Sequence, residues 1–382
     1  MPSTDSITEA LQTSTLEYDV VIVGGGMAGS ALASSLASRY RVLVLEKAEE
    51  ALSKDRVGES LPAAALRSLE ALGLGKALEQ SSHTDYQGVV SIWGHSKPFR
   101  KDFFDSLDGT GLHLDRGSLN SAITQIAIDN GVNFFYNVRV KSLESSHTGW
   151  SIGVEHPNGL NKFSAEFLVD ASGRSHVVAR KLGGKHVSED RAIAIHTVCE
   201  QTEALTAMPR SYIGTTMIEA VEHGWWYRAP LPNGKCVLSF HTDSDLPITS
   251  IMRKPNHWSN ALRSTQLISA GVTLPKAPDL NLTICAANSS FSQQSAGQNW
   301  LAIGDAALAF DPLSSQGMFN ALTTALLAKQ SIIQTLSGAP HATKTYAQKL
   351  RDVSDAYRHN LIEFYRTEQR WSESVFWKRR SA

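Results

Sequence analysis

The sequence predicts an α/β fold in which a Rossmann-like domain is interrupted by an antiparallel sheet and followed by C-terminal helices. Three observations predict it. An apolar strand at 18–23 runs through a glycine-rich turn into a small-residue helix, and a second strand follows at 41–45. Strand-like runs with irregular connections fill 186–284, as is typical of antiparallel sheets. Strand and helix character then returns at 300–303 and after Gly317.

The first of these elements forms a βαβ unit, so its strands should be parallel and its crossover right-handed. Further helices are expected at 62–80 and 118–130, with a strand at 132–136 after the second. Strands are also expected at 192–200, 225–230 and 235–242. The tail at 346–380 is helical and rich in aromatic residues, which predicts a helical pair that caps the domain. A membrane-surface helix is the alternative, although acidic residues interrupt its basic face.

Composition excludes several classes of protein. Hydrophobic residues make up 42% of the 382, and 36 Lys and Arg nearly balance 37 Asp and Glu, so neither a nucleic acid nor an anionic membrane is an expected partner. The three cysteines are far apart and the histidines lack metal-ligand spacing, so no disulfide framework and no metal site are expected. The polar first 17 residues do not resemble a signal peptide, and no apolar run approaches the ~20 residues of a membrane span. We therefore expect a cytoplasmic protein.

The turn after the first strand has the spacing of a dinucleotide-binding site. In YDVVIVGGGMAG, Gly24 permits the tight turn, Gly26 lets a pyrophosphate approach the backbone, and Gly29 permits close helix–strand packing. The helix that begins at Met27 and Ala28 would present its N-terminus to the phosphates. Glu46 ends the second strand, where its carboxylate can bind a ribose hydroxyl, and Lys47 follows it. A plain glycine turn is the competing interpretation, but the complete strand–turn–helix–strand context favours the nucleotide site.

Two later segments favour FAD over NAD. The segment EFLVDASGRSHVVAR ends a strand and turns through Gly173 into a helix that carries basic residues. In NWLAIGDAALAFDPLSSQGMFNAL, Asp305 follows a strand and can bond ribityl hydroxyls. The N–H groups near Gly317 and Met318 can face the electron-rich edge of a reduced flavin.

These motifs resemble those of the p-hydroxybenzoate-hydroxylase-type flavoprotein monooxygenases and the related flavin-dependent halogenases. The resemblance covers residues 18 to about 330. It implies one non-covalent FAD, with Asp305 on the ribityl chain, Arg116 of GLHLDRGSLNSAI on the cofactor, and Val140 of NVRVKSL beside the adenine. The loop from Pro312 to Met318 would lie at the flavin edge. In DASGR, two residues separate Asp170 from Gly173 where many hydroxylases have DG, which leaves the electron donor open.

The chain departs from the halogenases at one important position. RVGESLP resembles their GES/GEA segment and places Gly58, Glu59 and Ser60 near the flavin, and GWWYRAPL stands where they carry WxWxIP. Their catalytic lysine should follow the GES/GEA helix, but no lysine occurs between Lys76 and Lys97, and Tyr86 falls near its place. Lys97 and Lys101 are the other candidates but are displaced from that place, so halogenation is disfavoured.

The order of several short motifs is closer to the flavoproteins that mature the cysteine tryptophylquinone cofactor of lysine and glycine oxidases. These motifs are GES followed by LP, SIWG, HLDR, DPLSSQG and FYRTEQRWSESVFWKRR. The resemblance implies oxygen activation by reduced flavin and hydroxylation of a tryptophan in a partner, the precursor of a quinone-cofactor oxidase. A flavin reductase is the candidate electron donor, with direct reduction by NAD(P)H or by the substrate as alternatives.

Candidate catalytic residues are Glu59, His113 and Tyr227, of which Glu59 or His113 could exchange a proton. Trp225, Trp226 and Tyr227 are the candidate walls of an indole pocket. Each has a structural alternative: Glu59 as a charge at a helix start, His113 as a partner of the backbone, and the aromatic trio as core packing.

The expected domains are discontinuous. Residues 18–85, 106–185 and 285–340 would form the FAD-binding domain, 86–105 and 186–284 the substrate domain, and 341–382 the C-terminal helical segment. Two other functions stay open. One is a halogenase or hydroxylase of a free aromatic molecule, and the other is a non-catalytic FAD-bound chaperone.

Overall fold

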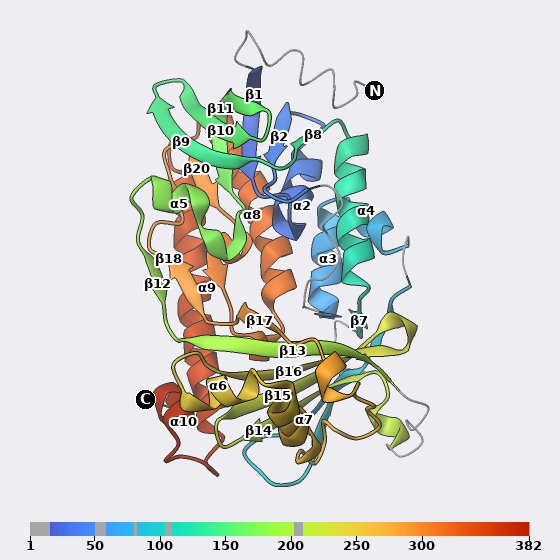
Figure 1. Cartoon of the computed structure of the whole chain (residues 1–382). Coiled ribbons are helices and arrows are strands. Elements are labelled where there is room, and N and C mark those ends of the chain that lie inside the picture. Colours follow the sequence, from blue (N-terminus) through green and yellow to red (C-terminus); the bar gives the residue numbers. More distant parts are fainter. Residues whose placement is uncertain (1–15, 50–58, 80–81, 104–108, 202–208, 382) are drawn as a thin grey trace.

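The computed structural model describes residues 16–49, 59–79, 82–103, 109–201 and 209–381. In Figure 1 an upper layer of strands with helices on its faces stands over a second sheet that runs across the lower part of the molecule. Helix α8 lies between the strands of the upper layer and the lower sheet, and the long helix α9 passes along one side of both. This arrangement confirms the predicted fold class.

The upper sheet is built on five parallel strands in the order β20-β11-β1-β2-β8. Their residues from Val20 to Val23 and from Val42 to Leu45 are buried in unbroken runs, as is typical of parallel strands covered on both faces. A hairpin, β9 and β10, extends β11 in antiparallel fashion and was not predicted from the sequence. The bounds are β1 Leu16–Val23, β2 Val42–Leu45, β8 Asn133–Phe135, β9 Arg139–Ser146, β10 Gly149–His156, β11 Gly159–Asp170, β19 Ala296–Gly297 and β20 Trp300–Ala302.

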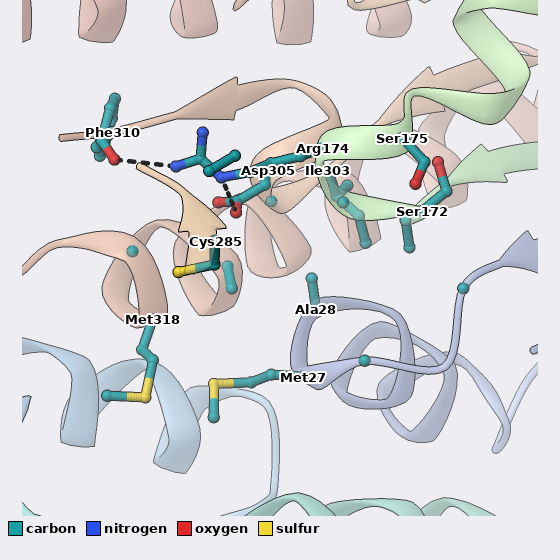
Figure 2. A pocket seen from close by; sticks show the side chains of 18 of the residues that line it. Met27, Ala28, Ser172, Arg174, Ser175, Cys285, Ile303, Asp305, Phe310 and Met318 are labelled. Carbon is teal, nitrogen blue, oxygen red and sulfur yellow. Dashed lines mark hydrogen bonds and ion pairs between the residues drawn. The ribbon is translucent and has the colours of Figure 1, made fainter. Parts of the chain in front are cut away.

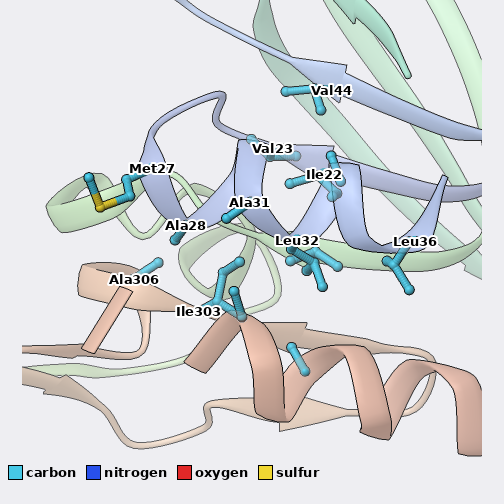
Figure 3. Packing of buried hydrophobic residues seen from close by; sticks show 14 of the residues in the cluster. Ile22, Val23, Met27, Ala28, Ala31, Leu32, Leu36, Val44, Ile303 and Ala306 are labelled. Atoms are coloured by element: carbon cyan, nitrogen blue, oxygen red, sulfur yellow. The ribbon is translucent and has the colours of Figure 1, made fainter. Parts of the chain in front are cut away.

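Helices with small and apolar residues cover this sheet. In Figure 3, Ala28, Ala31 and Leu32 of α2 face Ile303 and Ala306, which follow β20. Such small side chains let α2 approach the sheet closely and place the turn before it at the carboxyl end of β1. The bounds are α2 Met27–Leu36, α3 Ala63–Ala71, α4 Arg116–Asp129, α5 Val177–Lys181 and α8 Gly317–Leu336.

The lower sheet has seven strands in the order β17-β13-β16-β15-β14-β5-β6. Every neighbouring pair is antiparallel except β14 and β5, which are parallel. The expected boundary between 284 and 285 falls within β17. On one face α6 (Pro247–Met252) and α7 (Pro255–Arg263) complete a core in which Trp258 meets Trp226 edge-on at 4.9 Å. The strands are β5 Gly88–Ile92, β6 Phe99–Asp102, β13 Ala192–Glu200, β14 Thr215–Val221, β15 Gly224–Leu231, β16 Lys235–Asp243 and β17 Thr283–Ala286.

Two small sheets connect these layers. The first pairs β7 (Gly111–His113) with β3 (Ser60–Leu61) and β4 (Thr84–Tyr86). The second consists of β12 (His186–Ser188), β18 (Ser290–Ser292) and β21 (Leu308–Ala309). The first sheet carries Ser60 and His113 into the space between the nucleotide turn and the lower sheet.

The C-terminal helices α9 (Ala342–Arg366) and α10 (Val375–Ser381) pack against both layers. Their aromatic residues Tyr365, Phe376 and Trp377 are buried against Trp93, which follows β5, and Trp225 of β15. The tail therefore docks on the protein, as the capping interpretation predicts. None of the helices within the described ranges is long and apolar enough to cross a membrane.

Candidate functional site

A cavity of about 980 Å³ runs from the glycine turn after β1 to the lower sheet. This volume is at the upper end of the ~300–1,000 Å³ typical of small-molecule and cofactor sites, and an elongated dinucleotide needs such a volume. Glu46, Lys47 and Val140 line one end, and strands of the lower sheet close the other.

The glycine turn is too tightly packed for any side chain at two of its positions. Gly24 has a φ of +111°, and a Cβ there would lie 2.3 Å from the carbonyl oxygen of Ala171. A Cβ on Gly29 would lie 1.9 Å from the carbonyl oxygen of Gly24. Helix α2 begins with Gly26 as its N-cap and without a side-chain cap, so its first N–H groups are directed at the cavity that Gly26 lines.

Glu46 is held in place by the backbone. Its Oε2 accepts a hydrogen bond from the N–H of Gly25 at 2.6 Å and its Oε1 one from the N–H of Ala48 at 2.8 Å. Each carboxylate oxygen has a further lone pair, which can accept a bond from a ribose hydroxyl. The carboxylate therefore joins the end of β2 to the glycine turn and faces the cavity.

Asp305 lies opposite the glycine turn. Figure 2 shows Arg174 between Asp305 and the main chain of Phe310. The Nε of Arg174 is 3.5 Å from Oδ2 of Asp305, and its Nη2 donates to the carbonyl oxygen of Phe310 at 3.3 Å. Protein surrounds Asp305, which raises the pKa of its carboxyl, while Arg174 and Arg116 oppose that rise. Still, 36% of its side-chain surface is exposed, toward the cavity that it lines, where a ligand hydroxyl can reach it.

The loop from Pro312 to Met318 ends at α8. The N-cap residue Gln316 makes no side-chain cap, and a Cβ on Gly317 would meet no atom within 4 Å. The start of α8 is thus open toward the cavity, and its positive dipole end can stabilise negative charge there. Before the loop, the carboxylate of Asp311 accepts hydrogen bonds from the N–H of Leu313 and from the hydroxyl of Tyr365, both at 2.9 Å.

A buried polar network joins β3, β7 and β15. The hydroxyl of Tyr227 donates to Glu59 at 3.3 Å and lies 3.4 Å from Ser60 Oγ. His113 Nε2 is 3.3 Å from the carbonyl oxygen of Gly214, which can only accept, so Nε2 carries the hydrogen and Nδ1 accepts from Ser60 at 3.1 Å. Burial lowers the pKa of His113 to about 4, so its imidazole is neutral. His113 is fully buried and does not line the cavity; it orients Ser60.

Trp225 and Trp226 do not line the cavity either. Successive side chains of a strand point to opposite faces, so Trp226 enters the core with Trp258 and Trp225 the core with Trp93 and Tyr365. Trp225 stacks on His241 with ring centroids 3.7 Å apart and parallel planes. The structural alternative, core packing, describes both tryptophans, and Tyr227 alone of the three reaches the cavity.

The structure brings most of the predicted site residues to one cavity and adds others. Gly29, His113, Trp225 and Trp226 lie behind its walls, and Gly58 lies outside the described residues. The predicted residues on the wall are Gly24, Gly26, Met27, Ala28, Glu46, Lys47, Glu59, Ser60, Arg116, Val140, Tyr227, Asp305, Pro312, Gly317 and Met318. Sequence reasoning missed Arg174, Ser239, His241 and Cys285. Only Arg174 had a signal, because it belongs to the basic helix start in DASGR.

The cavity fits FAD. The glycine turn, which admits no Cβ at two positions, and the uncapped start of α2 match a pyrophosphate. The open start of α8 matches the electron-rich edge of a flavin, and the carboxylates of Glu46 and Asp305 match ribose and ribityl hydroxyls. All of these groups line the same cavity, as the parts of one bound dinucleotide require.

Comparisons with known proteins agree with this geometry. The tryptophan halogenase family matches residues 82–382, and a NAD(P)-binding Rossmann-like domain matches residues 22–52. The chain is 28% identical over 369 residues to the putative FAD-dependent oxidoreductase LodB of Marinomonas mediterranea, covering 96% of this chain and 97% of that protein. It is 24% identical to the tryptophan 2-halogenase of Chondromyces crocatus, covering 94% of this chain and 69% of that one.

Solved structures share the fold. The myxobacterial chondrochloren halogenase CndH superimposes with a TM-score of 0.83 at 22% identity, covering 96% of this chain and 86% of that one. The peptidyl tryptophan dihydroxylase QhpG, essential for tryptophylquinone cofactor biogenesis, superimposes with a TM-score of 0.76 at 23% identity, covering 96% and 79%. With the family match spanning most of its length, the chain belongs to the tryptophan halogenase family and is an FAD-dependent oxidoreductase.

Proposed function

We propose that this protein is a monooxygenase that hydroxylates a tryptophan in the precursor of a tryptophylquinone-containing oxidase. The observation that carries the proposal is the chemistry of the cavity beyond the flavin-edge loop. Beside the carboxylate of Glu59 the wall offers the hydroxyls of Ser60, Tyr227 and Ser239, which suit an uncharged aromatic ring with a polar group. The similarity to LodB along nearly the whole chain and the fold shared with a peptidyl tryptophan dihydroxylase support it.

In the proposed reaction, an aromatic C–H bond of the indole and one molecule of oxygen give a C–OH group and water, and two electrons and two protons are consumed. When FAD is bound and reduced, it supplies the activation of oxygen. A separate flavin reductase that uses a reduced nicotinamide is the proposed source of the electrons.

The protein's own residues bind, orient and exclude water. Asp305, Glu46 and the start of α2 would hold the cofactor, while the open start of α8 would face its reactive edge. Glu59 is the proposed group that exchanges a proton with the substrate, since it is a carboxylate on the cavity wall with its position fixed by Tyr227. Ser60 lies beside both and is oriented by His113.

Halogenation is the second candidate because the matching family carries that name. The described residues argue against it at one point. Among them, the cavity-lining lysines are Lys47 and Lys181, and both belong to the end near Glu46, where Lys181 donates to the carbonyl oxygen of Lys141. Tyr86, which falls near the expected lysine position, is buried beside His113, and burial raises its pKa to about 12. It is therefore a neutral hydroxyl and does not replace an amine.

The test is mass spectrometry of a candidate oxidase precursor after incubation with this protein, FAD, a flavin reductase, reduced nicotinamide and oxygen. Chloride and bromide are included so that halogen incorporation is visible in the same spectrum. The control is a precursor in which the target tryptophan is replaced by phenylalanine. We expect the mass of one or more oxygen atoms on one tryptophan of the first precursor and no change in the control.

Other outcomes overturn the proposal in distinguishable ways. Halogen on the tryptophan would make the protein a halogenase of a peptidyl substrate. An unmodified precursor, with flavin bound and repeatedly reoxidised, would redirect the search to free aromatic molecules.

A further inference from the structure

The end of the cavity opposite the glycine turn is a patch of the lower sheet. Five residues from four neighbouring strands line it, and we call them the sheet wall: Ala194 of β13, Tyr227 of β15, Ser239 and His241 of β16, and Cys285 of β17. The register places Tyr227 opposite Ser239, and Ala194 opposite both His241 and Cys285. Direct partners on adjacent strands point to the same face, so the sheet wall is one continuous surface.

Two polar atoms of the sheet wall have no hydrogen-bond partner in the described protein. They are Ser239 Oγ and His241 Nδ1. Their residues are only 1% and 5% exposed. A buried polar atom without a partner costs about 1–3 kcal/mol, so such atoms are rare and need a reason. Both residues line the cavity from one face of one strand, so a ligand bound there can supply the missing partners.

The chemistry of this end of the cavity selects the ligand class. The parallel stack on Trp225 fixes the orientation of the imidazole of His241. Burial, with smaller effects of His196 and Arg380, lowers the pKa of His241 to about 3, so the ring is neutral. Ser239 is a neutral hydroxyl. None of the five residues of the sheet wall is Arg or Lys, so the wall itself offers a carboxylate or a phosphate no cationic partner.

The remaining walls suit a flat aromatic ring. Figure 2 shows Met27 of α2, Met318 of α8 and Cys285 of β17, and all three line the same cavity. Sulfur atoms are polarisable and make favourable contacts with aromatic rings. An uncharged ring with one N–H donor matches a neutral imidazole acceptor, a hydroxyl and sulfur-rich walls. Free tryptophan would also bring a carboxylate, which the sheet wall cannot pair.

We propose that Ser239 and His241 position an uncharged indole, as in a peptide-bound tryptophan, with the ring N–H donating to His241 Nδ1 and Ser239 bonding a second polar atom of the ligand. The inference rests on the proposed function for the indole class and goes beyond it by naming the residues that select the ring nitrogen. Both act as positioning residues.

The test is a binding titration of the FAD-loaded protein, followed through the flavin absorption spectrum. The probes are N-acetyltryptophanamide, a neutral mimic of a peptidyl tryptophan, and its ring-N-methylated derivative, which lacks the donor. His241→Phe keeps a ring on Trp225 but removes Nδ1, and Ser239→Ala removes the hydroxyl. Ser259→Ala is the matched control, because Ser259 Oγ is also buried without a partner but lies on α7, away from the cavity.

We expect the wild type to bind the first probe more tightly than the methylated one. His241→Phe should lower the affinity for the first probe about threefold to tenfold, which corresponds to the loss of one neutral hydrogen bond. Its affinity for the methylated probe should equal that of the wild type. Ser239→Ala should also lower the affinity for the first probe, and Ser259→Ala should leave it unchanged. The flavin content and melting temperature of each variant identify any folding defect. Ser239→Ala removes only a hydroxyl, so it tests the proposal even if His241→Phe fails to fold.

The proposal is overturned if the wild type shows no saturable binding or if both variants bind the first probe as the wild type does. It is also overturned if His241→Phe lowers the affinity for both probes equally. These outcomes separate it from the proposed function. A precursor that gains oxygen equally with wild type and both variants would contradict the sheet-wall role alone. Selective weakening without any oxygen on the precursor would support the indole site and contradict the proposed reaction.

Discussion

The hydroxyl of Tyr227 donates a hydrogen bond to the carboxylate of Glu59 across 3.3 Å, which connects β15 of the lower sheet to the residue before β3. Both residues line the cavity and both are more than nine-tenths buried. Burial, together with the negative charge of Glu59, raises the pKa of Tyr227 well above its ordinary value, so the tyrosine stays a donor. Glu59 is thereby held in one orientation at the cavity wall.

Glu59→Gln tests the proton-exchange role. The amide keeps the shape and an acceptor for Tyr227 but cannot take a proton, so turnover should fall by about 10²-fold or more while flavin content is unchanged. Tyr227→Phe keeps the carboxylate and removes its hydrogen-bond donor, so it should lower turnover by a smaller factor. Turnover is measured as modified precursor per flavin. A Glu59→Gln protein with wild-type turnover would exclude Glu59 as the acid or base.

Asp305→Ala tests the cofactor site. The substitution removes a carboxylate that faces the cavity and leaves Arg174 without its ion-pair partner. Hydrogen bonds to charged groups contribute about 1.5–3 kcal/mol, so the affinity for FAD should fall about tenfold to a hundredfold. Flavin per protein in the purified variant, and titration of its apoprotein with FAD, measure the effect. Asp352→Ala, on the exposed side of α9, is the control, and full flavin occupancy of Asp305→Ala would contradict the assignment.

Asp311→Asn should change how stability depends on pH. Burial raises the pKa of Asp311 from 3.8 to about 6, with Asp190 adding to the rise and Arg380 and the hydrogen bonds opposing it. The native state therefore holds this proton more tightly than the unfolded state, and the ionised carboxylate costs stability above pH 6. That cost, about 3 kcal/mol for this difference in pKa, disappears as the pH falls through 6 toward 3.8.

The measurement for Asp311 is the difference in melting temperature between variant and wild type at several pH values. Because Asn cannot ionise, the melting temperature of the variant should rise most relative to the wild type above pH 6. That difference should disappear below pH 6. A difference that does not vary with pH would contradict the raised pKa.

Arg380→Met tests how the C-terminal helix is anchored. Arg380 Nη2 lies 2.6 Å from Oδ1 of Asp243, and the two side chains are 6% and 1% exposed. Removing one partner of a buried ion pair costs about 3–5 kcal/mol; Arg379, which also contacts Asp243, should hold the loss near the lower value. Lys378→Met breaks an exposed pair with Glu373 and should cost less than about 1 kcal/mol. Chemical denaturation compares them, and equal losses would show that the buried pair is not the anchor.

The sequence alone determined the nucleotide half of this protein. Gly24, Gly29 and Glu46 act within one βαβ unit, where a turn without Cβ atoms and a carboxylate at the strand end are local requirements. The strand before Asp305 and the helix after Gly317 could also be predicted from the sequence, because apolar runs and glycine positions mark them. The family resemblance followed from the same local motifs.

Only the tertiary structure decided which residues face the cavity from the lower sheet. Alternation along a strand shows that Ser239 and His241 share a face, but not which face meets the cavity. Trp225 and Trp226 had the expected composition of an aromatic pocket, yet packing against the C-terminal helices and α7 buries them in separate cores. Tertiary packing also places His113 behind the cavity wall, where it orients Ser60. Side-chain direction at such positions depends on how the two sheets, α8 and the C-terminal helices pack together, and contacts between segments so distant in sequence leave no local pattern.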